Sequence, residues 1–390
     1  MSELSGFERK IKTEMPVVAI CYDFDRTLSP DDMQAQGYIQ SVGYNIPDFW
    51  DESNALAFGN DMDQNLAYMY KMLEKSKGKF PFTRETLQRY GAGVKLFPGV
   101  EEWFDRIREY GRQKGVIVEH YVISSGLKEM IEGTKVADAF EKIYASSYYF
   151  DENGEAKWPA QVINYTNKTQ FLFRIQKGVL AFNDPAVNEF FSPEDLRIPF
   201  RNMVYIGDSD TDVPCMTLVN LNGGHSIGVY DEESGNKDKV YKMMDENRIK
   251  YFAPANYTDG SELDRIVKSI IDKTAVNEKL ENLHCVNKKE CVSILDKQDK
   301  NEKVRIAGII ALRESTSFAT THTVIGSLKN VNDWKRDEIE ELCKIALENS
   351  QVKYIFKDAD VKMFFKQLLK NAEEKSEAMK EVSELVKRKK

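Results

Sequence analysis

Two groups of aspartates have the residue types and the spacing for phosphate or metal chemistry. In Asp23–Thr27 (DFDRT) two carboxylates stand two residues apart, so on an extended segment both point to the same side. Gly207–Asp212 (GDSDTD) offers three more at alternate positions. Like charges this close destabilise one another unless a cation compensates them, and Mg²⁺ takes oxygen ligands. Both segments therefore predict a metal site, although each could also be a turn that caps backbone amides or faces solvent.

The second segment does not fit a helix-loop-helix calcium loop. That loop needs glycine at its sixth position and glutamate at its twelfth, where this chain has Val213 and Val219. A magnesium site that keeps several waters fits better. Zinc is not expected, because the four histidines and five cysteines show no paired metal-ligand spacing.

Two further side chains could bind a phosphate. Ser124 follows an apolar run and could donate its hydroxyl to a phosphate oxygen, or cap a helix that starts near Leu127. Lys168 comes just after Thr166 and Asn167, which we expect to cap a helix. A cation in a first helical turn is mildly disfavoured by the helix dipole, which favours a functional lysine there. A surface role for Lys168 stays open, with Lys157 and Lys177 as competing candidates.

Continuous apolar runs precede these polar groups and predict the strands that position them. The runs Val17–Tyr22, Val116–Ile123 and Met203–Ile206 end directly before the polar clusters. Unbroken apolar strands separated by helical patterns are typical of a doubly wound, Rossmann-like parallel sheet covered on both faces. Ligands bind beyond the carboxyl ends of such strands, where all these polar clusters fall. Further strands are expected at 142–145, 226–230 and 250–253.

The long stretch between the first two runs predicts an insert. It contains helical patterns at 65–75 and 83–90, with Thr83 as an N-cap. We expect an α/β core of residues 1–28 and 97–273, an inserted helical cap of 29–96, and a mostly helical carboxyl-terminal module of 274–390. The role of that module is open, and it could bind a protein partner or a second copy of the chain.

The order of these features resembles the motif series of the haloacid dehalogenase-like hydrolase superfamily. The series is an aspartate pair, a cap insert, a serine, a lysine and then Gly-Asp-x-x-x-Asp. The resemblance covers about residues 15–272 and is nearest to phosphoserine phosphatase-like members. Those enzymes carry a glutamate early in the cap, and this chain has Ser29–Gln34 (SPDDMQ) there, so phosphoserine itself is not predicted.

The resemblance implies a role for each matching residue. Asp23 would be the nucleophile that forms an aspartyl-phosphate, and Asp25 the general acid and then base. Thr27 would support them, while Ser124, Ser125, Gly126 and Lys168 would bind the phosphoryl group. Asp208 would bind Mg²⁺ with Asp23 and the backbone carbonyl of Asp25, and Asp212 would assist.

The implied activity is a Mg²⁺-dependent phosphatase acting on a small phosphorylated metabolite. A phosphotransferase or phosphomutase would use the same aspartate pair, and a binding or scaffold protein acting through its carboxyl-terminal helices is the alternative of another class.

Composition narrows the setting of this activity. The 390 residues carry a net charge of -8 and have a pI of about 5.4, which disfavours a general nucleic-acid binder. No run approaches the roughly 20 apolar residues of a membrane span, and the polar amino-terminal segment has no apolar core for secretion. We therefore expect a cytoplasmic protein with reduced cysteines that binds neither nucleic acid nor membrane.

Overall fold

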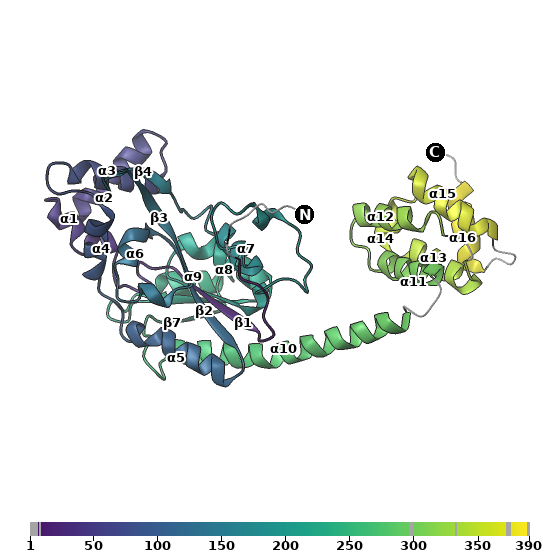
Figure 1. Cartoon of the computed structure of the whole chain (residues 1–390). Helices are drawn as coiled ribbons and strands as arrows, with labels where there is room; N and C mark the ends of the chain where they lie inside the picture. The colour runs from purple at the N-terminus through teal and green to yellow at the C-terminus, as the bar shows by residue number, and fades with distance from the viewer. Residues whose placement is uncertain (1–6, 8, 296–299, 332–333, 372–375, 388–390) are drawn as a thin grey trace. The chain divides into compact units, whose positions relative to one another are not determined.

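The computed structural model describes residues 7, 9–295, 300–331, 334–371 and 376–387. The chain divides into two compact units, Met1–Leu280 and Glu281–Lys390 (Figure 1). Helix α10 (Glu262–Leu295) contains the boundary between them. Ile270, Ile271 and Thr274 of this helix are buried in the first unit, which therefore extends past the boundary that we expected at residue 273.

A seven-stranded sheet forms the centre of the first unit. Its strand order is β4-β3-β2-β1-β5-β6-β7, and neighbouring strands are parallel except for the antiparallel pair β3 and β4. The strands are β1 (Val17–Tyr22), β2 (Ile117–Leu127), β3 (Lys142–Phe150), β4 (Ala156–Gln161), β5 (Met203–Gly207), β6 (His225–Tyr230) and β7 (Tyr251–Pro254). The expected doubly wound α/β core is confirmed, and β4 is an edge strand that the sequence did not reveal.

Strand β1 is apolar throughout because both of its faces are buried. Val18, Ile20 and Tyr22 belong to the core on one face of the sheet, while Val17, Ala19 and Cys21 belong to the core on the other. The first core also takes residues of α5 (Val100–Gln113) and α10, and the second takes residues of α7 (Thr169–Lys177), α8 (Val213–Leu221) and α9 (Asp238–Asp245). Because helices cover both faces of the sheet, every side chain of β1 is buried, whichever face it points to.

The insert between β1 and α5 is helical. It consists of η1 (Met33–Ala35), α1 (Tyr38–Ser41), α2 (Ile46–Gly59), α3 (Gln64–Ser76) and α4 (Arg84–Ala92). The Asp63 and Thr83 side chains cap α3 and α4 by accepting backbone N–H bonds. The Tyr148 hydroxyl of β3 donates to the Met69 carbonyl of α3 at 2.6 Å. This bond ties the end of the sheet to the insert, which we call the cap.

Short helices complete the first unit, and the second unit is entirely helical in the residues described. The first unit also contains α6 (Lys128–Glu132), η2 (Ala137–Ala139), η3 (Pro185–Asn188), η4 (Phe200–Asn202) and η5 (Asp210–Asp212). The second unit contains α11 (Lys300–Arg313), α12 (Phe318–Leu328), α13 (Arg336–Glu348), α14 (Ser350–Tyr354), α15 (Ala359–Leu368), η6 (Leu369–Asn371) and α16 (Glu377–Lys387) around a core of its own.

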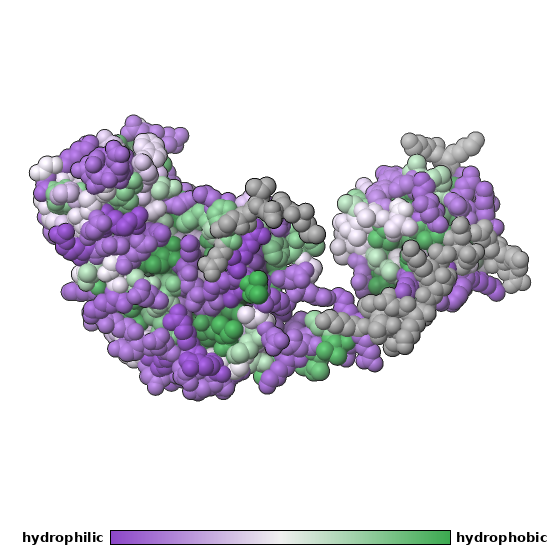
Figure 2. All heavy atoms as spheres, viewed as in Figure 1, coloured by the Kyte–Doolittle hydropathy of each residue, from purple (hydrophilic) through white to green (hydrophobic). Residues whose placement is uncertain are grey.

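Hydrophilic residues make up most of the face of the first unit drawn in Figure 2, with smaller apolar areas between them. Among the helices that the structure describes, none is both long enough and apolar enough to cross a membrane.

Candidate active site

Three adjacent strands bring the sequence motifs together. Strand β1 lies between β2 and β5 in the sheet, so Asp23 after β1, Ser124 near the end of β2 and Asp208 after β5 meet at one edge. The Asp23 amide donates to the Ile206 carbonyl of β5 at 2.9 Å, which continues the sheet pairing up to the site. Parallel strand pairing therefore places these side chains at the carboxyl edge, where ligands bind in such sheets.

A compact group of carboxylates lies at this edge. Asp23, Asp208 and Asp212 each offer an oxygen atom, and these atoms lie within 4.8 Å of one another. Burial, followed by the charge of Asp212, raises the pKa of Asp23 to about 6 and the pKa of Asp208 to about 8. A nearby cation stabilises the ionised form of crowded buried carboxylates.

Lys168 is the cation already in place among these carboxylates. Its fully buried ammonium lies 2.8 Å from Asp212 Oδ1 and 3.3 Å from Asp23 Oδ2. Burial alone would lower the pKa of Lys168, but the charges of Asp212 and Asp23 raise it, so the side chain is cationic. Lys157 instead pairs with Asp151 and Glu155, outside the site.

The helix that follows Lys168 begins at a different residue from the one that we expected. Helix α7 starts at Thr169, and Lys168 itself is the residue before its first turn. Thr166 and Asn167 were expected as caps but belong to a turn, where their amides donate to Asn164 Oδ1. The expectation missed this turn because the side chain that organises it precedes the predicted helix.

Tyr205 and Ser209 fix the orientation of Asp212. The Tyr205 hydroxyl donates to Asp212 Oδ1 at 2.9 Å, and the Ser209 hydroxyl donates to Oδ2 at 3.2 Å. With Lys168 on Oδ1 as well, both oxygens of Asp212 accept hydrogen bonds within the protein. Because both of its oxygens are already engaged, Asp212 is better placed to hold Lys168 than to act as a metal ligand. Tyr205 was missed from the sequence because it reads there as one more apolar strand residue.

Asp25 lies beside this group and is held by the cap. Its Oδ1 accepts a hydrogen bond from the Met33 amide at 2.8 Å. Burial, followed by the charges of Asp32 and Asp23, raises the pKa of Asp25 well above its usual value. A Cβ added at Gly126 would stand 2.8 Å from Asp25 Oδ2 and 2.4 Å from the Met33 methyl. The glycine therefore leaves the room that Asp25 needs.

Ser124, which we expect to bind phosphate, contacts Gly126 through its hydroxyl group. It accepts a bond from the Gly126 amide at 3.0 Å. Helix α6 begins at Lys128 without a side-chain cap, so the alternative of Ser124 as a helix cap is wrong. Ser125 lies next to it, with its carbonyl accepting from the Tyr68 hydroxyl of the cap at 2.7 Å. Thr27 is buried, and its Oγ1 has no hydrogen-bond partner among the described residues.

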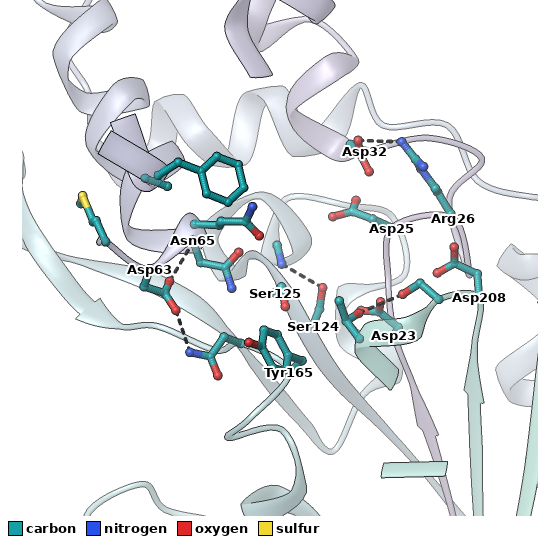
Figure 3. A pocket seen from close by; sticks show the side chains of 18 of the residues that line it. Asp23, Asp25, Arg26, Asp32, Asp63, Asn65, Ser124, Ser125, Tyr165 and Asp208 are labelled. Atoms are coloured by element: carbon teal, nitrogen blue, oxygen red, sulfur yellow. Dashed lines mark hydrogen bonds and ion pairs between the residues drawn. The ribbon is translucent and has the colours of Figure 1, made fainter. Parts of the chain in front are cut away.

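A cavity of about 640 Å³ opens above these residues (Figure 3). Core residues, among them Asp23, Asp25, Ser124 and Asp208, form its floor. Cap residues from the end of α2 to the start of α3 form its far wall, and the whole lining comprises Asp23, Asp25, Arg26, Asp32, Ala57, Phe58, Asp61, Met62, Asp63, Gln64, Asn65, Ser124, Ser125, Gly126, Asn164, Tyr165, Asp208, Ser209, Thr211 and Lys239. The cavity therefore lies between the core and the cap.

The donor set at the floor of the cavity fits a hard divalent cation. Only carboxylate oxygens are offered by the three grouped side chains, and such oxygens are the ligands that Mg²⁺ takes. Asp208 has no hydrogen-bond or ion-pair partner of its own among the residues that the structure describes, and burial followed by the charges of Asp212 and Asp23 raises its pKa. Asp208 and Asp23 are therefore the residues best placed to hold a metal.

The chain is similar to a protein known by its sequence and to several solved structures. No family model matches the chain. An uncharacterized protein from Borreliella burgdorferi is 28% identical over 272 residues, which cover 63% of this chain and 94% of the relative.

Similar solved structures include a haloacid dehalogenase family hydrolase from Salmonella enterica serovar Typhi, at 16% identity and a TM-score of 0.45 over 67% of this chain and 74% of the other. A phospho-aspartyl intermediate analogue of phosphoserine phosphatase matches at 15% identity and a TM-score of 0.40, over 65% and 99% of the two chains. A probable phosphoserine phosphatase from Vibrio cholerae matches at 12% identity and a TM-score of 0.44, over 70% and 68%. The chain is thus similar to haloacid dehalogenase family hydrolases, while its fold and its site stand on its own strand order and side chains.

Proposed function

We propose that this protein is a Mg²⁺-dependent phosphatase that hydrolyses a small phosphorylated metabolite through an aspartyl-phosphate on Asp23. The observation that carries the proposal is the placement of the Asp23 carboxylate. It lies within 4.8 Å of two further carboxylates and 3.3 Å from the buried Lys168 ammonium, at the floor of a capped cavity. This is the arrangement of charges that attack by an anionic nucleophile on an anionic phosphate requires.

In the first step an Asp23 oxygen attacks phosphorus, and the bond between phosphorus and the ester oxygen breaks. Asp25 gives its proton to the leaving oxygen, so that the product is a neutral alcohol. Its raised pKa supports this role, because a carboxyl group must keep its proton near neutral pH in order to donate it. Ser124 and Lys168 would hold the phosphoryl oxygens through the step.

In the second step water attacks the phosphorus of the aspartyl-phosphate while Asp25 accepts a proton from that water. The bond between phosphorus and the Asp23 oxygen breaks, which releases phosphate and restores the carboxylate. Bound Mg²⁺, held by Asp23 and Asp208 and, as the resemblance implies, by the Asp25 carbonyl, would offset the repulsion between carboxylate and phosphate. Asp212 would keep Lys168 aligned throughout.

The test is phosphate release from a panel of small phosphate esters, with Mg²⁺ and with EDTA. Asp23→Asn should abolish release without unfolding the protein. Asp105→Asn is the matched control, because it removes the same charge from a side chain that is 96% exposed on α5. Release that persists in Asp23→Asn would refute the proposal.

Two other results would assign the protein a different function. Phosphate transfer to an added alcohol instead of water would assign a phosphotransferase. A folded protein that binds Mg²⁺ and acts on no ester would favour the binding function of residues 274–390. We expect the cytoplasm as its compartment, in keeping with five free cysteines.

A further inference from the structure

We propose that the substrate is the phosphate monoester of an amino alcohol, whose ammonium group binds to Asp61 at the cap end of the cavity. This inference rests on the proposed phosphatase function and adds the class of the leaving group. The cap end of the cavity is the part lined by Ala57, Phe58, Asp61, Met62, Asp63, Gln64, Asn65, Asn164 and Tyr165.

Aromatic side chains stand open to solvent at the cap end. Phe58 is 76% exposed and Tyr165 is 56% exposed, although both belong to the cavity lining. Figure 3 shows Tyr165 across the cavity from Asn65, with Asp63 beside them. Exposed aromatic rings in a cavity provide faces on which an alkyl chain or an ammonium group can pack.

The charges of the lining exclude a second anionic group at the cap end. Two carboxylates, Asp61 and Asp63, lie there, and the cap end contains no cation among the described lining residues. The two cations of the lining belong to the core side. Arg26 is already paired with Asp32 at 3.0 Å. The charge of Lys239 lowers the pKa of Asp208, so this lysine acts on the core side of the cavity. A carboxylate on the leaving group, such as that of phosphoserine, would therefore be repelled at the cap end.

Hydrogen bonds within the protein already engage the Asp63 carboxylate at the cap end. Asp63 Oδ1 accepts from the Asn65 and Leu66 amides, and its Oδ2 accepts from Asn164 Nδ2. Asn65 Nδ2 donates to the Ile163 carbonyl at 2.8 Å, which leaves its Oδ1 free among described residues. Each of the two asparagine amide groups thus has one of its two N–H donors engaged within the protein.

Asp61 provides the free negative charge. Its carboxylate has no hydrogen-bond or ion-pair partner in the part of the chain that the structure describes, and its backbone holds the left-handed φ of 49°. Such strain in a residue other than glycine is concentrated at functional sites. The cap end therefore offers an unpaired carboxylate next to aromatic faces, a combination that suits an alkylammonium ion.

The experiment compares esters that differ in charge but not in shape, using the full chain. Phosphocholine is paired with 3,3-dimethylbutyl phosphate, and phosphoethanolamine with propyl phosphate. We expect kcat/KM to be about tenfold higher for each cationic ester than for its neutral partner. Asp61→Asn should remove most of this preference while leaving the neutral esters within twofold, because asparagine tolerates the left-handed backbone.

Asp51→Asn is the matched control, since it removes the same charge from α2 of the cap, at a position outside the cavity lining. The cationic preference should survive in this variant. Hydrolysis of neutral esters with no cationic preference, or a preference unchanged in Asp61→Asn, would overturn the inference and leave the phosphatase function intact.

Calorimetric binding of the same ester pairs tests the subsite independently of turnover. If no ester is hydrolysed, the phosphatase function fails. Tighter binding of the cationic esters that Asp61→Asn abolishes would still support the subsite, whereas equal binding of both members of each pair would refute it.

Discussion

Tyr205→Phe tests whether the hydrogen bonds around Asp212 keep the catalytic lysine aligned. The Tyr205 hydroxyl and the Lys168 ammonium both bind Asp212 Oδ1, at 2.9 and 2.8 Å. Removing the hydroxyl deletes one of the two donors that fix the position of this oxygen atom. Lys168 is then free to move toward or away from the phosphoryl group. Asp23, which we propose as the nucleophile, and the other side chains of the site should stay in place.

The expected loss follows from the strength of that bond. A hydrogen bond to a charged group contributes about 1.5–3 kcal/mol, and about 1.4 kcal/mol in an activation barrier changes the rate tenfold. We therefore expect kcat to fall about ten- to a hundredfold in Tyr205→Phe. The KM should change less, because the cavity walls are untouched.

Tyr144→Phe is the matched control. Tyr144 is as fully buried as Tyr205, and its hydroxyl donates to the Leu180 carbonyl at 2.9 Å, away from the site. Each variant loses one hydrogen bond, so the free energy of unfolding in urea should fall by about 1.5–3 kcal/mol in Tyr205→Phe and by about 0.5–1.5 kcal/mol in Tyr144→Phe. Only Tyr205→Phe should lose kcat. A kcat within twofold of the parent, or an equal loss in both variants, would refute the positioning role.

Three further predictions concern the acid, a buried carboxyl and the division of the chain. Gly126→Ala should lower kcat at least tenfold because its methyl group would displace Asp25, whereas Gly326→Ala, with open space around it, should not; equal rates would contradict this. Burial raises the pKa of Glu129 to about 7. Because the folded state binds this proton more tightly than the unfolded state does, the free energy of unfolding is highest below about pH 4.5 and falls as the pH rises to about 7. Glu129→Gln should reduce the difference between urea unfolding free energies at pH 5 and pH 8, by up to about 3 kcal/mol, and an unchanged difference would contradict the effect. A chain ending at Leu280 should keep full turnover, since every described cavity residue lies in the first unit; lost activity in a folded truncation would show otherwise.

The strands and the floor of the site could be predicted because their signals are local. Each central strand is buried on both faces, so its sequence is apolar throughout and ends abruptly at a polar residue. Parallel pairing then fixes that these ends meet. Strand β4 gave no such signal, because it lies at the edge of the sheet. Trp158 is 71% exposed there, and the strand contains Pro159.

The supporting contacts could not be predicted, since they depend on pairs that the sequence does not mark. Tyr205 reads as a core residue until the fold brings Asp212 under its hydroxyl. The Met33 amide reads as one more backbone group in the insert until it reaches Asp25. Asn164 reads as part of a loop, although its side chain joins that loop to Asp63 of the cap.

The charge of the cavity connects the metal, the cap and the class of substrate. The lining holds six carboxylates, Asp23, Asp25, Asp32, Asp61, Asp63 and Asp208, against two cations, Arg26 and Lys239. A phosphate dianion would be repelled from this surface, and the divalent cation that we propose at the floor would offset this repulsion in binding as well as in attack. The proposed cation would act at the phosphoryl end and would leave the cap end acidic. The cap would therefore select among phosphate esters by the charge of the leaving group, and a positive group is the one that this field draws in.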